Sequence, residues 1–211
     1  MKLFACVVLL AFGLPGGVLA QQSVQSTPDA ARLARAASNL MPLARVLEAA
    51  AAEDPKWPIN HKPDAMDATQ LACVRQNLRQ PQFQELMAKR AADYVRDNPA
   101  RVADDIRLLE GGGGQLFARM INEGIVAGRE KREVDIMKVV GASKPEEIAG
   151  MMTLANDPRQ QPLRELIGFN QTISNGETGK AAGENAALTF MLPMLMAAMT
   201  TCNVPASALM K

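Results

Sequence analysis

Residues 81–99 read PQFQELMAKRAADYVRDNP. Apolar side chains recur in this stretch every three or four residues, which is the spacing of one face of an α-helix. The stripe consists of Phe83, Leu86, Met87, Ala91 and Tyr94. Proline opens the segment, where a helix tolerates it, and an Asn-Pro pair at its end caps the next helix. The stretch therefore predicts an amphipathic helix with one face in the core.

The same spacing recurs on both sides of this segment, and proline or capping residues separate the repeats. Residues 27–29 are Thr-Pro-Asp, which join a capping hydroxyl, a proline at the first helical position and an acid in the first turn. They predict the start of a first helix, which Pro42 should kink or split. A second helix is expected to begin near Asp64 or Asp67 and to end before Pro81.

The composition agrees with a helical core. The chain of 211 residues has 6 phenylalanines, 1 tryptophan and 1 tyrosine but 13 methionines. A β-sandwich or barrel would draw more heavily on aromatic and β-branched side chains. No alternation of apolar and polar residues is long enough to indicate a sheet. We therefore predict an all-α fold, with residues 21–211 forming a single-domain bundle of about eight helices.

Two local patterns mark expected helix ends. Gly111–Gly114 precedes a helix, where free backbone amides could receive an anion. No strand comes before these glycines and no Lys-Ser or Lys-Thr pair follows, so the phosphate-loop pattern fails and we interpret them as a cap or hinge. Ser143 stands three residues before Glu146, and this capping-box spacing predicts another helix start.

A weak internal repeat in the sequence suggests a duplication. An apolar pair at residues 71–72 lies ten residues before Pro81, and a second pair at residues 148–149 lies ten before Pro158. Each proline opens an amphipathic helix. The hypothesis is that residues 65–97 and 144–173 are two copies of a helix–proline–helix unit, although such spacing also arises independently in helical proteins.

Residues 1–20 have the three-part order of a secretory signal peptide. Lys2 gives the positive start, Leu3–Leu14 is an uncharged apolar stretch, and residues 18–20 suit cleavage after Ala20. The apolar stretch is too short to span a membrane, so we expect no stable membrane insertion. The alternative is a buried N-terminal helix. The leader predicts export to the periplasm.

Removal of this leader leaves a chain with no net charge. The full sequence has 23 basic and 22 acidic residues, and only Lys2 of the basic ones lies in the leader. Nucleic acids and anionic membranes attract proteins that carry a positive field. Balanced charge therefore argues against both as partners. The mixed run at residues 129–133 indicates a solvated helix face.

Two cysteines, Cys73 and Cys202, remain after the leader. In an oxidising compartment such an isolated pair predicts a disulfide. Two free thiols and a redox pair are the alternatives. Neither cysteine has the Cys-x-x-Cys spacing that is typical of redox catalysis, so the structural bridge is favoured.

A cluster of thioethers near the C-terminus suggests a metal-binding alternative. It consists of Met191, Met194, Met196 and Met199. Thioether sulfur is a soft ligand that can hold copper(I). On an ideal helix these four side chains spread over an arc of about 200°, which is too wide for convergence. Core packing is favoured, and no cofactor or metal is expected.

Residues suited to catalysis are scarce. His61 is the single histidine, which excludes a histidine-rich zinc site. The pairs Asp104-Asp105 and Glu146-Glu147 are neighbours on helices, so their carboxylates point about 100° apart. Carboxylates from separate helices could still meet, which keeps an envelope enzyme as an alternative. We expect no enzyme activity and no catalytic residue.

The layout resembles small all-helical periplasmic proteins of proteobacteria. The residues that carry this resemblance are Cys73 in a Leu-Ala-Cys-Val run, residues 93–99 (DYVRDNP) and residues 104–109 (DDIRLL) before glycines. Most such proteins have no assigned activity. Some are immunity proteins that protect a cell against toxins delivered into its periplasm. The resemblance implies an all-helical fold and transfers no functional residue.

These observations together predict a protein that acts by binding another protein. The most specific form of this hypothesis is an immunity or inhibitor protein that neutralises a secreted antibacterial toxin by direct contact. Aromatic side chains are frequent anchors of such contacts, so Trp57, His61 and Tyr94 are the candidate partner surface. The alternatives are a periplasmic copper or small-ligand carrier that uses the methionine-rich last helix, and the envelope enzyme.

Overall fold

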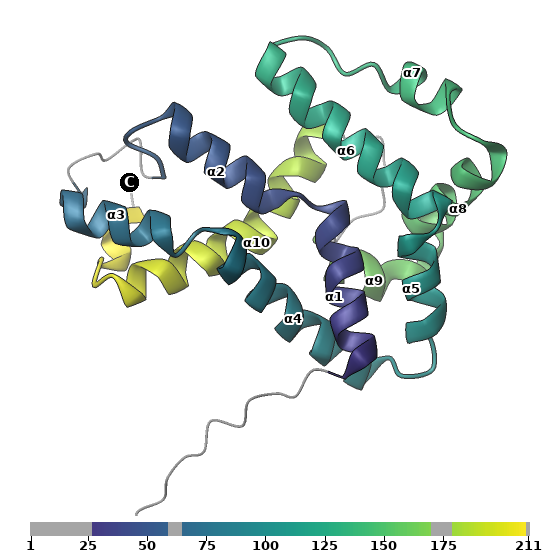
Figure 1. The fold of residues 1–211 in the computed structure, drawn as a ribbon, viewed down its shortest axis with the longest axis horizontal. Coiled ribbons are helices and arrows are strands. Elements are labelled where there is room, and N and C mark those ends of the chain that lie inside the picture. Colours follow the sequence, from purple (N-terminus) through teal and green to yellow (C-terminus); the bar gives the residue numbers. More distant parts are fainter. Residues whose placement is uncertain (1–26, 59–64, 170–178, 210–211) are drawn as a thin grey trace, which may run out of the picture.

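The computed structural model describes residues 27–58, 65–169 and 179–209, which contain ten α-helices and no strand (Figure 1). The all-α prediction is confirmed. The leader and His61 lie outside the described residues. The helices are α1 (Pro28–Leu40), α2 (Leu43–Glu53), α3 (Ala68–Gln76), α4 (Gln80–Asp97), α5 (Val102–Glu110), α6 (Gly112–Glu130), α7 (Ile136–Gly141), α8 (Pro145–Asn156), α9 (Gln161–Leu166) and α10 (Gly179–Thr201).

Proline and capping residues set the helix boundaries, mostly where the sequence places them. The Thr27 hydroxyl accepts a hydrogen bond from the Ala30 amide at 3.2 Å and starts α1. Pro42 separates α1 from α2, so the first predicted helix is two helices. Asp67 caps α3, and its carboxylate accepts from the Gln70 amide at 2.8 Å. The described residues contain two helices more than the eight expected, and the split at Pro42 accounts for one of them.

The predicted capping box at Ser143 and Glu146 is wrong by one residue. Helix α8 begins at Pro145, so Lys144 is the residue before it. The Lys144 amide donates to the Glu147 carboxylate at 2.9 Å. The Ser143 hydroxyl instead bonds back to the Val139 carbonyl at 2.8 Å. Proline at the first helical position shifted the start by one place.

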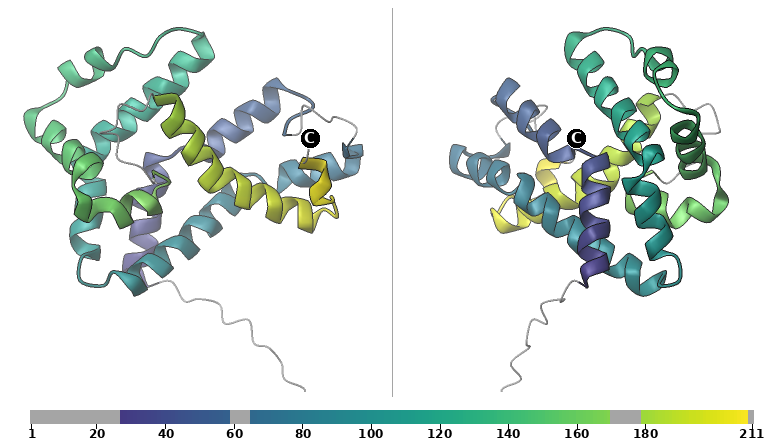
Figure 2. Two further views of the ribbon diagram at one scale, coloured as in Figure 1. Left: turned by 180° about the vertical axis from the view of Figure 1, so that it is seen from behind. Right: turned by 45° about the vertical axis from the view of Figure 1, so that its right-hand side comes forward.

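Helix α4 holds the centre of the fold, and its apolar stripe faces inward as predicted. Phe83, Met87, Ala91 and Tyr94 are buried. Helix α1 packs along α4, while α10 crosses it (Figures 1 and 2). The buried ring of Phe190 on α10 meets Phe83 edge to face, with 5.8 Å between centroids.

The Phe190 ring has two further neighbours. The Arg90 guanidinium lies 4.9 Å from its centroid and also donates to the Glu165 carbonyl at 2.6 Å. Gly168 ends the α9 region with a positive φ of 85°, which favours glycine. A Cβ at this glycine would lie 3.0 Å from Cδ2 of Phe190. Phe190 therefore joins α10 to α4 and to the end of α9.

Glycine sets the approach of α6 to α8. Gly111 caps α5, as the sequence predicts, and Gly112–Gly114 form the first turn of α6. Helices α6 and α8 pack closely together. A Cβ at Gly113 would lie 2.7 Å from the Gly150 Cα, a distance that real Cβ atoms do not adopt. These two glycines therefore permit direct backbone contact between the helices.

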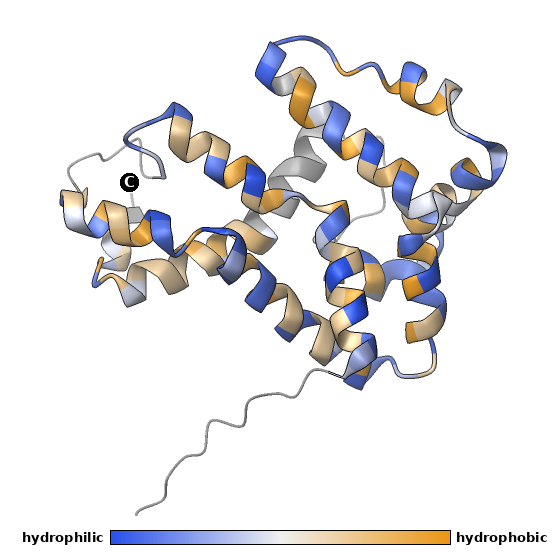
Figure 3. Ribbon diagram, in the orientation of Figure 1, coloured by the Kyte–Doolittle hydropathy of each residue, from blue (hydrophilic) through white to orange (hydrophobic). Residues whose placement is uncertain are grey.

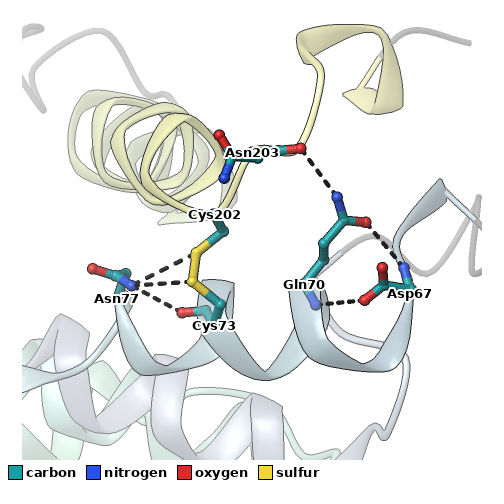
Figure 4. Close-up of a disulfide and its surroundings, with 6 residues drawn as sticks. All are labelled: Asp67, Gln70, Cys73, Asn77, Cys202 and Asn203. Carbon is teal, nitrogen blue, oxygen red and sulfur yellow. Dashed lines mark hydrogen bonds between the residues drawn. A yellow bond between two sulfur atoms is a disulfide. The ribbon is translucent and has the colours of Figure 1, made fainter.

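The predicted disulfide is present between Cys73 on α3 and Cys202, which follows α10. Their Cα atoms are 5.8 Å apart, although 129 positions separate them in sequence. Figure 4 shows Asn77 beside the bridge, donating to the Cys73 carbonyl at 3.0 Å, and Gln70 donating to the Asn203 carbonyl at 3.0 Å. The bridge and these polar contacts attach the end of α10 to α3.

The proposed duplication stays a prediction. Its first segment contains α3 and α4, of 9 and 18 residues, and its second contains α8 and α9, of 12 and 6 residues.

The glycine contact leads to a stability test within one helix. We expect Gly113→Ala to lower the free energy of unfolding by about 1–3 kcal/mol, because the new methyl group forces α6 and α8 apart. Gly124→Ala is the matched control on α6, since nothing lies within 4 Å of a Cβ there. The control should leave stability unchanged or raise it by up to about 1 kcal/mol. Urea denaturation measures both, and equal effects would contradict the contact.

The disulfide leads to a second test. Reduction should lower the free energy of unfolding by up to about 5 kcal/mol, because the bridge restricts a long loop in the unfolded chain. Thermal and urea unfolding with and without a thiol reductant measure this loss. The double variant Cys73→Ser with Cys202→Ser should match the reduced protein and should not respond to reductant. An unchanged unfolding midpoint on reduction would contradict the prediction.

Candidate protein-binding surface

The segment that follows the middle of α6 is the most exposed part of the described chain. We call residues 126–141 the arm; it contains the end of α6, a loop and α7. Helix α7 has no buried residue. Figure 1 shows the loop and α7 running outside α6, away from α1 and α4. The arm therefore contributes surface and adds little to the core.

Local hydrogen bonds give the arm a defined shape. Lys131 has a φ of 53°, and the Arg132 amide reaches back to the Ala127 carbonyl at 3.0 Å, which closes the C-terminus of α6. The Arg132 guanidinium then binds the Glu123 carboxylate at 2.5 Å. Asp135 caps α7 by accepting from the Lys138 amide at 2.9 Å.

The arm concentrates the exposed apolar side chains. Seven large hydrophobic residues are exposed among the described residues, and four of them fall between positions 126 and 137. These four are Val126, Val134, Ile136 and Met137. Met137 is the most exposed of the four, with 79% of its surface accessible to solvent. Figure 3 shows the apolar residues of the loop and α7 on the outside of the fold. Grouped exposed hydrophobic residues mark interaction sites, whereas scattered single ones do not.

A groove of about 790 Å³ lies between α6 and α7. Its charged lining residues are three cations and three acids: Arg119, Arg132, Lys138, Glu123, Glu133 and Asp135. The Arg132 guanidinium holds the pKa of the Glu123 carboxyl below its usual value. Both signs of charge therefore surround the apolar residues at neutral pH. A nucleic-acid site would instead carry one sign of charge.

The three aromatic residues predicted for partner binding lie in different environments. Trp57 is half-buried against the core, and its carbonyl accepts from the Arg75 guanidinium at 2.9 Å. His61 lies outside the described residues. The expectation that Tyr94 lies on a partner surface is wrong, because only 7% of this residue is exposed.

Tyr94 belongs instead to a buried polar network. Its hydroxyl donates to the Asp105 carboxylate at 2.5 Å, and Asp105 is 1% exposed. Arg101 binds the same carboxylate through two nitrogens, at 2.8 and 3.0 Å, and donates to the Gln160 side chain at 2.7 Å. Burial, followed by the bond to Asp105, raises the pKa of Tyr94. The network joins α4, α5 and the short turn before α9.

The carboxylate pairs do not form a converging acid–base site. Asp104 is exposed and binds Arg107, while its neighbour Asp105 is buried. Glu146 is exposed, whereas Glu147 binds the Arg119 guanidinium at 3.0 Å. Among the described residues no group of three or more histidine, cysteine or acidic side chains could hold a metal ion. The enzyme alternative, with carboxylates from separate helices, stays a prediction.

The methionine cluster divides between the inside and the outside of α10. Met194 and Met199 are buried in the core, while Met191 is partly buried. Met196 is 39% exposed. The four thioethers therefore do not share one face of the helix, and two of them fill the core as flexible apolar side chains.

Sequence reasoning missed the arm as a candidate surface. The spacing of Ile136, Val139 and Val140 suggests the buried stripe of a helix. Helix α7 has only six residues, however, and one and a half turns bury little apolar area. The usable signal was the set of apolar residues Val134, Ile136 and Met137, interrupted by Asp135, which directly follows the charged run at 129–133.

No protein-family model matches the chain, and no curated protein and no solved structure matches it either. Among the described residues, no helix is both long enough and apolar enough to cross a membrane. The function must therefore be argued from the residues themselves.

The buried network leads to a matched test on two neighbouring residues. We expect Asp105→Asn to lower the free energy of unfolding by about 2–3 kcal/mol, because it removes the charge of a buried carboxylate that binds Tyr94 and the partly exposed Arg101. Asp104→Asn is the control and should change stability by less than about 0.5 kcal/mol, because its ion pair is exposed. Urea denaturation measures both.

A second readout of this variant pair follows from Tyr94, which is the single tyrosine of the chain. Its tyrosinate absorbance should appear only above the ordinary tyrosine pH range, and Asp105→Asn should move it to lower pH. Because the folded-state pKa is raised, stability from this group is present below about pH 10 and is lost at higher pH. An unshifted titration in Asp105→Asn would contradict the role of Asp105.

Proposed function

We propose that this protein acts by binding another protein through the arm. The observation that carries the proposal is the group of four exposed hydrophobic side chains between positions 126 and 137. Each Å² of apolar surface removed from water contributes about 25 cal/mol. Met137 suits such a contact because its flexible thioether adapts to the shape of a partner pocket.

The chemistry around these side chains suits a protein more than a small ligand. The groove beside them is open and is lined by equal numbers of cationic and acidic side chains. Protein interfaces combine an apolar centre with a polar rim that fixes orientation. The partner is therefore a protein with an apolar pocket surrounded by charges of both signs.

In its most specific form, the proposal is a periplasmic immunity or inhibitor protein against a secreted antibacterial toxin. Residues 1–20 support export, and the Cys73–Cys202 bridge supports an oxidising compartment. The resemblance to small helical periplasmic proteins, some of which are immunity proteins, supports the class of partner. An inhibitor needs a shaped surface, which the exposed arm supplies.

The proposal is tested by site-specific photocrosslinking in the producing cell. A photoreactive amino acid in place of Met137 should crosslink to one partner when the cells meet neighbours that deliver toxins into the periplasm. The same group at Ala103, an exposed position on α5, is the control and should give no such product.

A survival assay completes the test. Met137→Asp should place a charge in the apolar contact and remove protection, with a fall in partner affinity of about a hundredfold for a central contact. Met152→Asp, which is exposed on α8, should leave protection intact. If cells that lack the protein survive as well as wild-type cells and Met137 gives no crosslink, the proposal is wrong.

A further inference from the structure

Between positions 189 and 201, helix α10 has an exposed face without charge. Its inner stripe consists of buried residues spaced four positions apart: Phe190, Met194, Ala198 and, just past the helix, Cys202. The opposite side, which we call the α10 face, is exposed and consists of Leu192, Pro193, Met196, Ala197, Thr200 and Thr201. No charged residue occurs from position 189 to 201. Surface helices normally carry charged residues toward water. The α10 face therefore has the composition of a covered surface.

A groove of about 570 Å³ lies beside this face, between α4 and α10. Small and apolar side chains line most of it, among them Leu86, Ala88, Ala92, Met194, Ala197 and Ala198. Small side chains let a second helix approach closely. The carbonyl oxygen of the Gln82 side chain, also in this lining, is enclosed and has no hydrogen-bond partner within the described residues.

The rim of the groove on α4 carries two opposite charges. Glu85 and Lys89 are both exposed and stand one helical turn apart. Neither forms an ion pair within the part of the chain that is described. The groove lining contains no other charged residue. The surface therefore offers one cation and one anion to whatever covers it.

We propose that a second copy of this chain covers the α10 face, in a two-fold symmetric dimer built from α4 and α10. A two-fold interface uses the same patch on both copies, so the patch must be complementary to itself. Here the ridge formed by Leu192 and Met196 lies beside the groove. Two-fold rotation places the ridge of each copy in the groove of the other.

The charges on the rim fit this symmetry. When two α4 helices lie antiparallel across a two-fold axis between positions 85 and 89, Glu85 of each copy meets Lys89 of the other. Two ion pairs then form from two side chains that have no ion-pair partner among the described residues. A rim with one sign of charge would repel its own copy. This self-complementarity favours a second copy over a partner of different sequence.

The dimer is tested first on the α10 face by sedimentation velocity over a concentration series. The wild-type protein should show twice the mass of one chain at high concentration. Leu192→Asp and Met196→Asp should each give a monomer, because they place a carboxylate in the apolar contact. Both side chains are exposed, so circular dichroism should show a folded protein. Met137→Asp, on the arm, is the control and should remain a dimer.

A charge exchange tests the pairing itself. Glu85→Lys and Lys89→Glu should each weaken the dimer by about tenfold or more, because each replaces attraction by repulsion. An equimolar mixture of these two variants should form a heterodimer, since each Lys then meets a Glu again. The double variant, with both changes in one chain, should recover the wild-type dissociation constant. A wild-type protein that is monomeric at every concentration overturns the proposal, as does a mixture that associates no better than its components.

Discussion

The contacts of Phe190 are the constraint on which the arrangement of the helices depends. This fully buried ring is held by Phe83 and Arg90 of α4 and by the close backbone of Gly168 after α9. A partly buried cation requires compensation, and Arg90 finds it in the ring and in the Glu165 carbonyl. The ring fixes the middle of α10 and the disulfide fixes its C-terminal end, so α10 crosses α4. The groove between the two helices is a consequence of that crossing.

Much of this architecture could be predicted from the sequence because it depends on short-range spacing. The stripe on α4, the break at Pro42 and the caps at Thr27 and Asp67 follow from residues within one or two helical turns. The cysteine pair was predictable because only two cysteines follow the leader. Contacts such as Gly113 with Gly150 were not, because no local pattern states which helices meet.

Tyr94 shows where reasoning about the candidate site failed. It belongs to the predicted buried stripe, yet its aromatic ring also suggested an anchor on the partner surface. At the level of sequence, its partner, Asp105, is only one half of a non-converging pair with Asp104. Burial of either side chain alone would be costly, whereas burial of the two together with Arg101 satisfies each polar group. The sequence lists the members of such a network separately and does not show that they meet.

The two proposed surfaces share no residue, and this separation has a functional consequence. The arm belongs to α6 and α7, and the dimer surface belongs to α4 and α10. A dimer through α10 therefore leaves both arms available. A chain with balanced charge lacks long-range electrostatic steering, so its association with a partner is slower than that of a strongly charged inhibitor. A dimer carries two arms and can bind an oligomeric partner at two points. The second contact then forms at a high effective concentration, which compensates for the slow association of a single arm. Pairing through α10 would thus raise the residence time of the complex without any change in the arm.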